Sequence, residues 1–291
     1  MSERNDTLDT LRVAPARPRW RLGRDIPRYL VLTLGAIAMV GPFVWMVATS
    51  LTGDAQLGRA DASLLPDPVT TDPYARLDEA FPFWRFTANS IAVAVVSTLL
   101  QLVTSATAGY AFSRLRFRGS NALFVLYLVT MMIPMQVIIV PLFIEMRYLR
   151  LVDSYAGLLL PTLVSSFGVF MLRQAFLALP RELDEAAYVD GAGHLRVFAQ
   201  VLLPLVSPAL ATFSVFAFMS SWNAFLWPLV IAQTQAHMTL PVGLSLLHGG
   251  HTTAWNVVMA GSTVSVLPIL ALYVFAQRYV VRGIAFTGIK S

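Results

Sequence analysis

Cysteine is absent from the sequence, and lysine occurs once, at Lys290. The absence of cysteine excludes disulfides, thiolate catalysis, iron–sulfur clusters and cysteine-based zinc sites. No glycine-rich stretch precedes Lys290 with the spacing of a phosphate-binding loop, so the chain lacks the lysine that such a loop needs. We therefore expect no cofactor in this chain and expect any ATP to be bound by another chain.

Charged residues are also scarce, at 13% against 56% hydrophobic residues. No Asp or Glu falls in the central turns of the long apolar segments, and none follows Asp190. Proton relays and intramembrane acid–base enzymes need such groups, so we do not expect an enzyme or a proton-driven transporter. His237, His248 and His251 have no acid nearby to complete a metal site, so no metal is expected. The expected surroundings are the lipid bilayer, with no nucleic-acid partner.

Long apolar segments make up most of the chain. Each exceeds the roughly 20 residues that cross a bilayer as a helix. The sequence therefore predicts an all-α, multi-pass membrane protein with six transmembrane helices. Residues 1–29 form an Arg-rich tail in which Pro15, Pro18 and Pro27 discourage a long helix, and residues 30–291 form a single six-helix domain. The six segments lie near residues 30–51, 88–112, 120–144, 156–179, 206–232 and 257–280.

Arginines are unevenly distributed around the predicted helices. They concentrate in the tail, in the loop with Arg114, Arg116 and Arg118, near Arg181 and Arg196, and at the C-terminus. Fewer lie at the opposite helix ends. By the positive-inside rule, both termini and the region around Arg181 are expected to be cytoplasmic.

One polar stretch stands out between the fourth and fifth segments, at residues 180–205. Pro180 can open a helix whose first turn holds Glu182, Asp184 and Glu185, where the helix dipole favours acids. The stretch is therefore expected to begin with a short helix.

A glycine turn and a second short helix are expected to follow. Gly191 and Gly193 supply left-handed or hairpin geometry that ends the first helix. Leu195, Phe198 and Leu202 then recur at helical spacing before Pro204 stops the second helix. Such an elbow, with small side chains and exposed acids, suits docking into the groove of a partner. A loop that only connects two helices in solvent is the alternative.

The stretch contains Glu185-Ala186-Ala187, then Gly191, then Val201 and Leu203-Pro204. This order and spacing resembles the cytoplasmic signature loop of the permease subunits of binding-protein-dependent ABC importers, in which the position of Val201 is more often Ile. Other stretches resemble the carbohydrate-type branch of this family, related to the smaller maltose permease. They are residues 41–46, 49–51, 89–90, 109–114, 132–134, 140–142, 222–223, 240–244 and 283–291.

The resemblance implies a type I ABC importer permease fold that forms half of a solute pathway in the prokaryotic inner membrane. A second homologous permease would complete the pathway, two ATPase subunits with ATP and Mg²⁺ would lie beneath, and an extracytoplasmic binding protein would deliver a sugar or sugar-like solute. Residues 180–205 would be the coupling loop. The residues assigned to ATPase coupling are Glu185, Ala186, Ala187, Asp190, Gly191, Leu203 and Pro204.

Three polar or aromatic residues are candidates for the solute path. Gln136 stands between Pro134 and Pro141, where the helix is expected to break and amide groups could line a cavity. Trp222 and Asn223 combine an aromatic face with an amide, which suits a neutral sugar. A tryptophan at the membrane interface and an asparagine bonded to a neighbouring helix are the alternative for this pair.

The loop from about residue 52 to residue 87 is expected on the exterior side. Its aromatic residues Phe81, Phe83, Trp84 and Phe86 fit an interfacial belt. The loop could dock a binding protein or serve as a solvated linker. Inside the membrane, Ser105 and Gly109 have the spacing of a helix-packing pair.

Two other classes of function stay open from the residues alone. One is an ATPase-independent carrier or channel for a small polar solute, and the other is a membrane scaffold without a solute path. The solute itself is not specified by the sequence.

Overall fold

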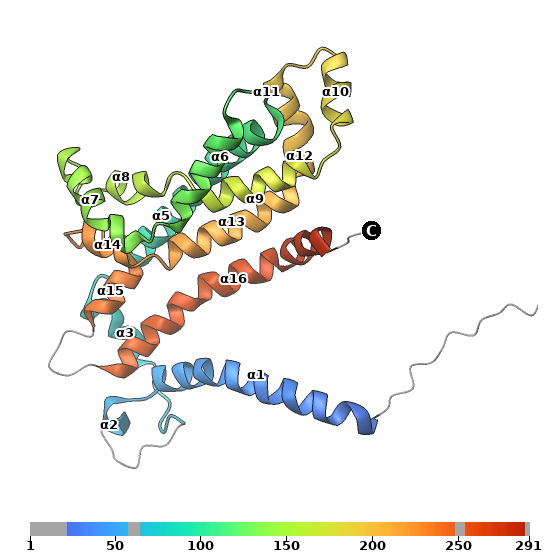
Figure 1. Ribbon diagram of the computed structural model, residues 1–291. Coiled ribbons are helices and arrows are strands. Elements are labelled where there is room, and N and C mark those ends of the chain that lie inside the picture. Colours follow the sequence, from blue (N-terminus) through green and yellow to red (C-terminus); the bar gives the residue numbers. More distant parts are fainter. Residues whose placement is uncertain (1–21, 58–64, 248–253, 289–291) are drawn as a thin grey trace, which may run out of the picture. The chain divides into compact units, whose positions relative to one another are not determined.

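The computed structural model describes residues 22–57, 65–247 and 254–288, and over these ranges the chain is almost entirely helical (Figure 1). Apart from one isolated bridge between Thr52 and Val69, the described ranges contain no β-structure. The chain divides into two compact units, Met1–Trp45 and Met46–Ser291. Helix α1 (Leu22–Ser50) crosses this division.

Helix α1 begins inside the region expected to be a non-helical tail. It contains both Pro27 and Pro42. Pro27 lies close to the start of the helix, where few backbone hydrogen bonds are at stake, so α1 runs through it. The apolar part, Pro27–Ser50, is long enough to cross a membrane.

The second unit contains two more helices of membrane-spanning length, α5 (Phe83–Arg114) and the Trp255–Gln277 part of α16 (Trp255–Gly288). The described chain thus has three unbroken candidate spans, or up to six if each of three bent helix pairs counts as one span. This upper count equals the number of helices predicted. The bent pairs are Ser120–Met132 with Met135–Tyr148, Tyr155–Thr162 with Ser166–Leu177, and His194–Leu205 with Ser207–Trp222.

The bends have local causes in the sequence. The first pair turns by 100° where Ile133 and Pro134 are extended, between η2 (Thr130–Met132) and α7 (Met135–Tyr148). This break confirms the one expected beside Gln136. The other pairs turn by 45° and 79°. The first pair begins with α6 (Ser120–Val129), and the second consists of α8 (Tyr155–Leu159), η3 (Leu160–Thr162) and α9 (Ser166–Leu177). The third joins the segment His194–Leu205 to α13 (Ser207–Trp222).

The predicted segment 206–232 is also interrupted. Its helices are α13 and the short α14 (Leu226–Ile231), and residues 223–225 between them are not helical. Trp227 of α14 donates from Nε1 to the carbonyl oxygen of Gly157 at 3.1 Å. With Val93 and Met146 it belongs to an apolar cluster that joins α5, α7, α8 and α14.

Helix α5 packs against α9 and α13 and is the centre of the second unit. Ser105 is fully buried, and a Cβ atom added to Gly168 of α9 would lie 2.4 Å from its Oγ. A Cβ at Gly109 would lie 3.0 Å from the backbone nitrogen of Arg173. The expected packing role of Ser105 and Gly109 is therefore confirmed, because the two backbones approach as closely as small residues permit.

The segment expected to be an exterior loop is largely folded into short helices. Phe81, Phe83 and Phe86 are at most 5% exposed and form a core with Leu77 and Leu240, so the expected interfacial belt is wrong for them. Of the four aromatic residues, Trp84 alone is exposed. Hydrophobic burial against the later helices explains the difference. The short helices of this segment are α2 (Asp54–Leu57), α3 (Asp72–Ala75) and α4 (Leu77–Ala80), and Leu240 begins α15 (Leu240–Leu246).

Candidate functional site

The polar stretch between α9 and α13 forms the predicted helix–turn–helix. Its first arm is α10 (Glu182–Val189), with Glu182, Asp184 and Glu185 in the first turn. Its second arm, His194–Leu205, contains α11 (His194–Arg196), the π-helical segment η4 (Val197–Leu202) and α12 (Leu203–Leu205). We call the whole segment Glu182–Leu205 the elbow. Figure 1 shows α10 and α11 together beyond one end of the α9 and α13 pair.

Gly191 makes the turn of the elbow. Its φ of +77° is in the left-handed region. The amide of Gly191 donates to the carbonyl of Tyr188, and the amide of Ala192 donates to the carbonyl of Ala187. This pair of bonds is a Schellman C-cap, which requires a left-handed residue and favours glycine. Gly193 is extended at φ −80°, so the left-handed geometry expected of both glycines belongs to Gly191 alone.

Pro204 does not stop the second arm. The helix continues to Leu205, and the chain bends at Val206 before α13 begins. Proline is tolerated here because it follows the π-helical segment and occupies the first turn of α12. Leu203 packs into the core beneath the elbow, and Pro204 is exposed.

The remaining predicted coupling residues lie together on α10. Glu185, Ala186 and Asp190 are exposed, whereas Ala187 is half-buried against the core that joins the elbow to α5, α9 and α13. Two large apolar side chains are also exposed, Val189 at 88% and Leu195 at 85%. The first arm thus presents acids and Val189 outside the candidate spans, whereas Leu195 lies in the bent pair His194–Leu205 with Ser207–Trp222.

A buried ion pair that was not anticipated joins the elbow to α5. Arg114 Nε lies 3.4 Å from Asp184 Oδ2, and the two side chains are 3% and 11% exposed. Arg114 Nη2 also donates to the carbonyls of Phe176 and Leu179, at 2.7 and 2.9 Å, so it ties the end of α9 as well. Neither Arg114 Nε nor Asp184 Oδ1 has a hydrogen-bond partner. The two side chains therefore attract each other electrostatically, without a hydrogen bond between them.

The environment of Asp184 favours its neutral form. Burial raises its pKa above the ordinary aspartate value, while the guanidinium groups of Arg114 and Arg181 act in the opposite direction and Glu185 adds to the rise. The net upward shift agrees with the loose geometry, because a long pair without a hydrogen bond does not offset desolvation.

A second tie connects α5 to the tip of the elbow. The Tyr110 hydroxyl donates to the backbone carbonyl of His194 at 3.2 Å, and the Tyr188 hydroxyl lies 2.7 Å from His194 Nδ1. Tyr110 and Arg114 are one helical turn apart on α5. The sequence placed both at the end of a span, but nothing in it indicated which distant residues they contact.

The three candidates for the solute path are not brought together by any contact in the structure. Gln136 follows the 100° bend and is exposed. Trp222 is 3% exposed, stacks on Phe218, and donates from Nε1 to the carbonyl of Ser265 at 3.1 Å. Asn223 is exposed and donates to the carbonyl of Met219 in its own helix. Trp222 is therefore a core residue and not an exposed interfacial tryptophan, and Asn223 bonds its own helix and not a neighbouring one, so the alternative for this pair is wrong on both counts.

A polar network holds the loop between α14 and α15. Asn89 donates to the carbonyls of Ala236 and Met238 and accepts from the Tyr155 hydroxyl. Asp153 lies near the start of the same loop. It accepts from the amides of Gln233 and Thr234, the Thr234 hydroxyl and His237 Nδ1. Among the described residues no group of three metal-ligating side chains occurs, and His248 and His251 lie outside them.

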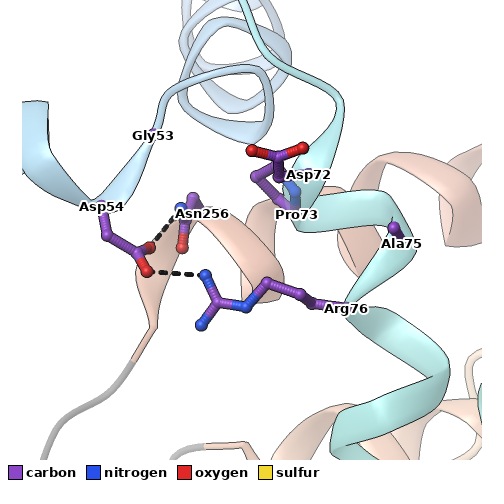
Figure 2. A pocket seen from close by; sticks show the side chains of 7 residues that line it. All are labelled: Gly53, Asp54, Asp72, Pro73, Ala75, Arg76 and Asn256. Carbon is purple, nitrogen blue, oxygen red and sulfur yellow. Dashed lines mark hydrogen bonds and ion pairs between the residues drawn. The ribbon is translucent and has the colours of Figure 1, made fainter.

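The segment before α5 is also tied to the start of α16 (Figure 2). Asp54 accepts from Asn256 Nδ2 at 2.7 Å and from Arg76 at 2.6 Å, beside a pocket of about 320 Å³. These hydrogen bonds, that from Asn256 first, lower the pKa of Asp54. Asn256 Nδ2 also donates to the carbonyl of Thr52. The expected solvated linker is therefore a folded segment fixed at both of its ends.

Comparison with known proteins identifies the family. Residues 101–286 match the family described as binding-protein-dependent transport system inner membrane component. The chain is 35% identical over 267 residues to the arabinooligosaccharides transport system permease of Halalkalibacterium halodurans, covering 89% of this chain and 96% of that protein. It is 34% identical over 273 residues to the sn-glycerol-3-phosphate transport system permease of Yersinia pestis, covering 91% and 97%.

A solved structure agrees with this assignment. A bacterial ABC transporter involved in the import of the acidic polysaccharide alginate contains a chain that superposes with a TM-score of 0.78 at 26% identity, covering 91% of this chain and 99% of that one. The relatives are transport permease subunits and not enzymes. The chain therefore belongs to the family of binding-protein-dependent transport system inner membrane components, the multi-pass permease subunits of ABC importers.

Proposed function

We propose that this permease forms half of the pathway for a sugar or sugar-like solute, and that the elbow couples it to a cytoplasmic ATPase. The observation that carries the proposal is the geometry of the elbow. A helix, a left-handed Gly191 and a second helix form the elbow, and its first arm presents exposed acids and Val189 outside the candidate spans. The arginine distribution supports a cytoplasmic position for the elbow and both termini.

Each predicted residue takes a role that fits its position. Glu185 and Asp190 are exposed and can pair with basic residues of the ATPase. Ala186 is exposed and small, so it permits close approach, whereas Ala187 packs the helix against its own core. Gly191 fixes the angle between the arms.

The second arm would transmit movement to the membrane helices. Leu203 and Pro204 lie just before the bend at Val206, where the arm joins α13. Closure of the ATPase dimer would move the elbow as a lever. The helix bundle would then alternate between inward-facing and outward-facing states.

The solute class is inferred from the relatives. Those described above are named for arabinooligosaccharides and glycerol 3-phosphate, and the solved relative imports alginate. Solutes rich in hydroxyl groups are common to all three. Exposed amides at Gln136 and Asn223 are the polar groups that we assign to the path, together with Trp222 beside Asn223 in the sequence.

The assembly would contain a second homologous permease, two ATPase subunits and an extracytoplasmic binding protein. ATP and Mg²⁺ would bind to the ATPase chains. Residues 1–29 would form a cytoplasmic tail and residues 30–291 one permease domain, with coupling loop 180–205.

The test is purification of the tagged protein from gently solubilised membranes, followed by mass spectrometry and sugar-stimulated ATP hydrolysis. Recovery of an ATPase and a second permease is expected. The Glu185→Arg and Gly191→Asp variants should insert normally but lose transport. The matched control is Glu79→Arg, at an exposed position of α4, and this variant should retain transport. If the chain were recovered alone and transported solute without ATP, it would be an ATPase-independent carrier and the coupling role would be wrong.

A further inference from the structure

Five arginines line one cavity at the end of α5. The cavity has a volume of about 630 Å³ and lies among the last turn of α5, the loop at residues 115–119, the start of α6 and the end of α9. No acidic residue lines it. Its arginines are Arg114, Arg116, Arg118, Arg173 and Arg181.

The positive charge of this cavity is largely uncompensated. Arg114 pairs with Asp184, but in the part of the chain that the structure describes the other four arginines form no ion pair with a carboxylate. Arg173 is fixed in place, because its Nε donates to the carbonyl of Phe112 and its guanidinium lies 4.1 Å from the ring centre of Phe124. Arg116 and Arg118 are exposed and free to turn toward a ligand.

The start of α6 adds backbone donors to the same cavity. Gly119 precedes the helix with φ +84°, and no side chain caps its first turn. Asn121 and Ala122, in this first turn, line the cavity. Amides at a helix start and surrounding guanidinium groups are the donors that bind phosphate groups.

Apolar surface begins directly beside these donors. Leu123, Val125 and Leu126 of α6 are between 51% and 65% exposed, and Leu177 of α9 is 41% exposed. The cavity also lies between the end of one candidate span and the start of the next, so it is at a membrane boundary. A ligand that fits both features has an anionic phosphate and long hydrocarbon chains.

We propose that this arginine-lined cavity binds the phosphate headgroup of an anionic phospholipid, whose acyl chains lie along α6. Basic pockets at helix ends recognise such headgroups in membrane proteins. The site does not depend on the solute or on the coupling role of the elbow. If lipid binding at this site were disproved, the proposed solute class and the coupling role would be unaffected.

The experiment measures lipid retention by the full-length protein in its transporter complex. Native mass spectrometry would count phosphatidylglycerol and phosphatidylcholine bound after purification from mixed vesicles, with and without inorganic phosphate. The test variant is Arg116→Gln with Arg118→Gln. The matched control, Arg85→Gln with Arg147→Gln, removes the same charge from exposed positions outside the cavity.

The wild type and the control should retain phosphatidylglycerol in preference to phosphatidylcholine. The test variant should bind phosphatidylglycerol on the order of 30-fold more weakly, because each arginine near an anionic headgroup contributes about a factor of five. Equal phosphatidylglycerol retention in the two variants would overturn the proposal. Complete displacement by millimolar inorganic phosphate would indicate a site for a free anion. Retention by the isolated chain but not by the complex would indicate that an acidic partner chain fills the cavity.

Discussion

Arg114 and Asp184 should respond very differently to removal of their charges. Arg114→Gln removes two charge-assisted bonds, from Arg114 Nη2 to the carbonyls of Phe176 and Leu179. Each such bond contributes about 1.5–3 kcal/mol, so the loss of both should cost about 3–6 kcal/mol. We expect the midpoint of thermal unfolding to fall by on the order of 10 °C.

Asp184→Asn should change stability by less than about 1 kcal/mol. Burial raises the pKa of Asp184, so folding disfavours its charged form, and the neutral amide of asparagine should replace it at little cost. Arg114 keeps both of its carbonyl acceptors in this variant. The assay is thermal unfolding of the detergent-solubilised protein, followed by tryptophan fluorescence at neutral pH.

The pH dependence supplies an internal control. A raised folded-state pKa means that the folded protein binds this proton more tightly than the unfolded chain does. The contribution of Asp184 to stability is therefore fully present below the ordinary aspartate pKa and is lost as pH rises through the raised value. The Asn variant should lack this component. Equal losses of stability for Arg114→Gln and Asp184→Asn would refute the reasoning, because they would indicate a tight pair whose attraction exceeds the cost of burial.

Two further predictions concern the packing at Gly243 and the hydrogen bonds of Asp54. Gly243→Ala should destabilise the protein by about 1–3 kcal/mol through overpacking, because the new Cβ would lie 2.2 Å from Phe86 Cδ2. The control Gly193→Ala should not destabilise it, because no neighbouring atom lies within 4 Å of the new Cβ. Equal midpoints of thermal unfolding for the two variants would contradict this packing. The hydrogen bond from Asn256 lowers the pKa of Asp54, so the contribution of Asp54 to stability is present above the ordinary aspartate pKa and is lost as pH falls through the lowered value. Asp54→Asn should therefore reduce the loss of stability at acid pH, measured by thermal unfolding. An unchanged loss at acid pH would count against the contact.

Local features of the elbow were predictable from the sequence. The acids in its first turn, the helical spacing of its second arm and the glycine turn each depend on residues within one or two turns of one another. Gly191 could be identified because a left-handed C-cap has a strong residue preference. The expectation at Pro204 was off by one residue, because the second arm ends at Leu205, directly before the bend at Val206.

Long-range contacts were not predictable in this way. Phe81 and Phe83 have the composition of an interfacial belt, and only their packing against Leu240 makes them core residues. Arg114 and Asp184 are 70 positions apart in the sequence and carry no local pattern that pairs them. The six apolar segments were evident from length and hydropathy, and the break beside Gln136 was expected from Pro134, whereas the other two bends were not predicted.

The π-helical turn at Val197–Leu202 makes the length of the second arm as important as its composition. A π-turn accommodates one residue more than an α-turn does. Deleting one residue there would let the arm become a regular α-helix, and each residue of such a helix corresponds to a rotation of about 100°. His194 and the whole first arm would then face a different direction relative to α13. The segment should consequently tolerate many substitutions but few insertions or deletions of a single residue, because the number of residues in it sets the direction of the first arm.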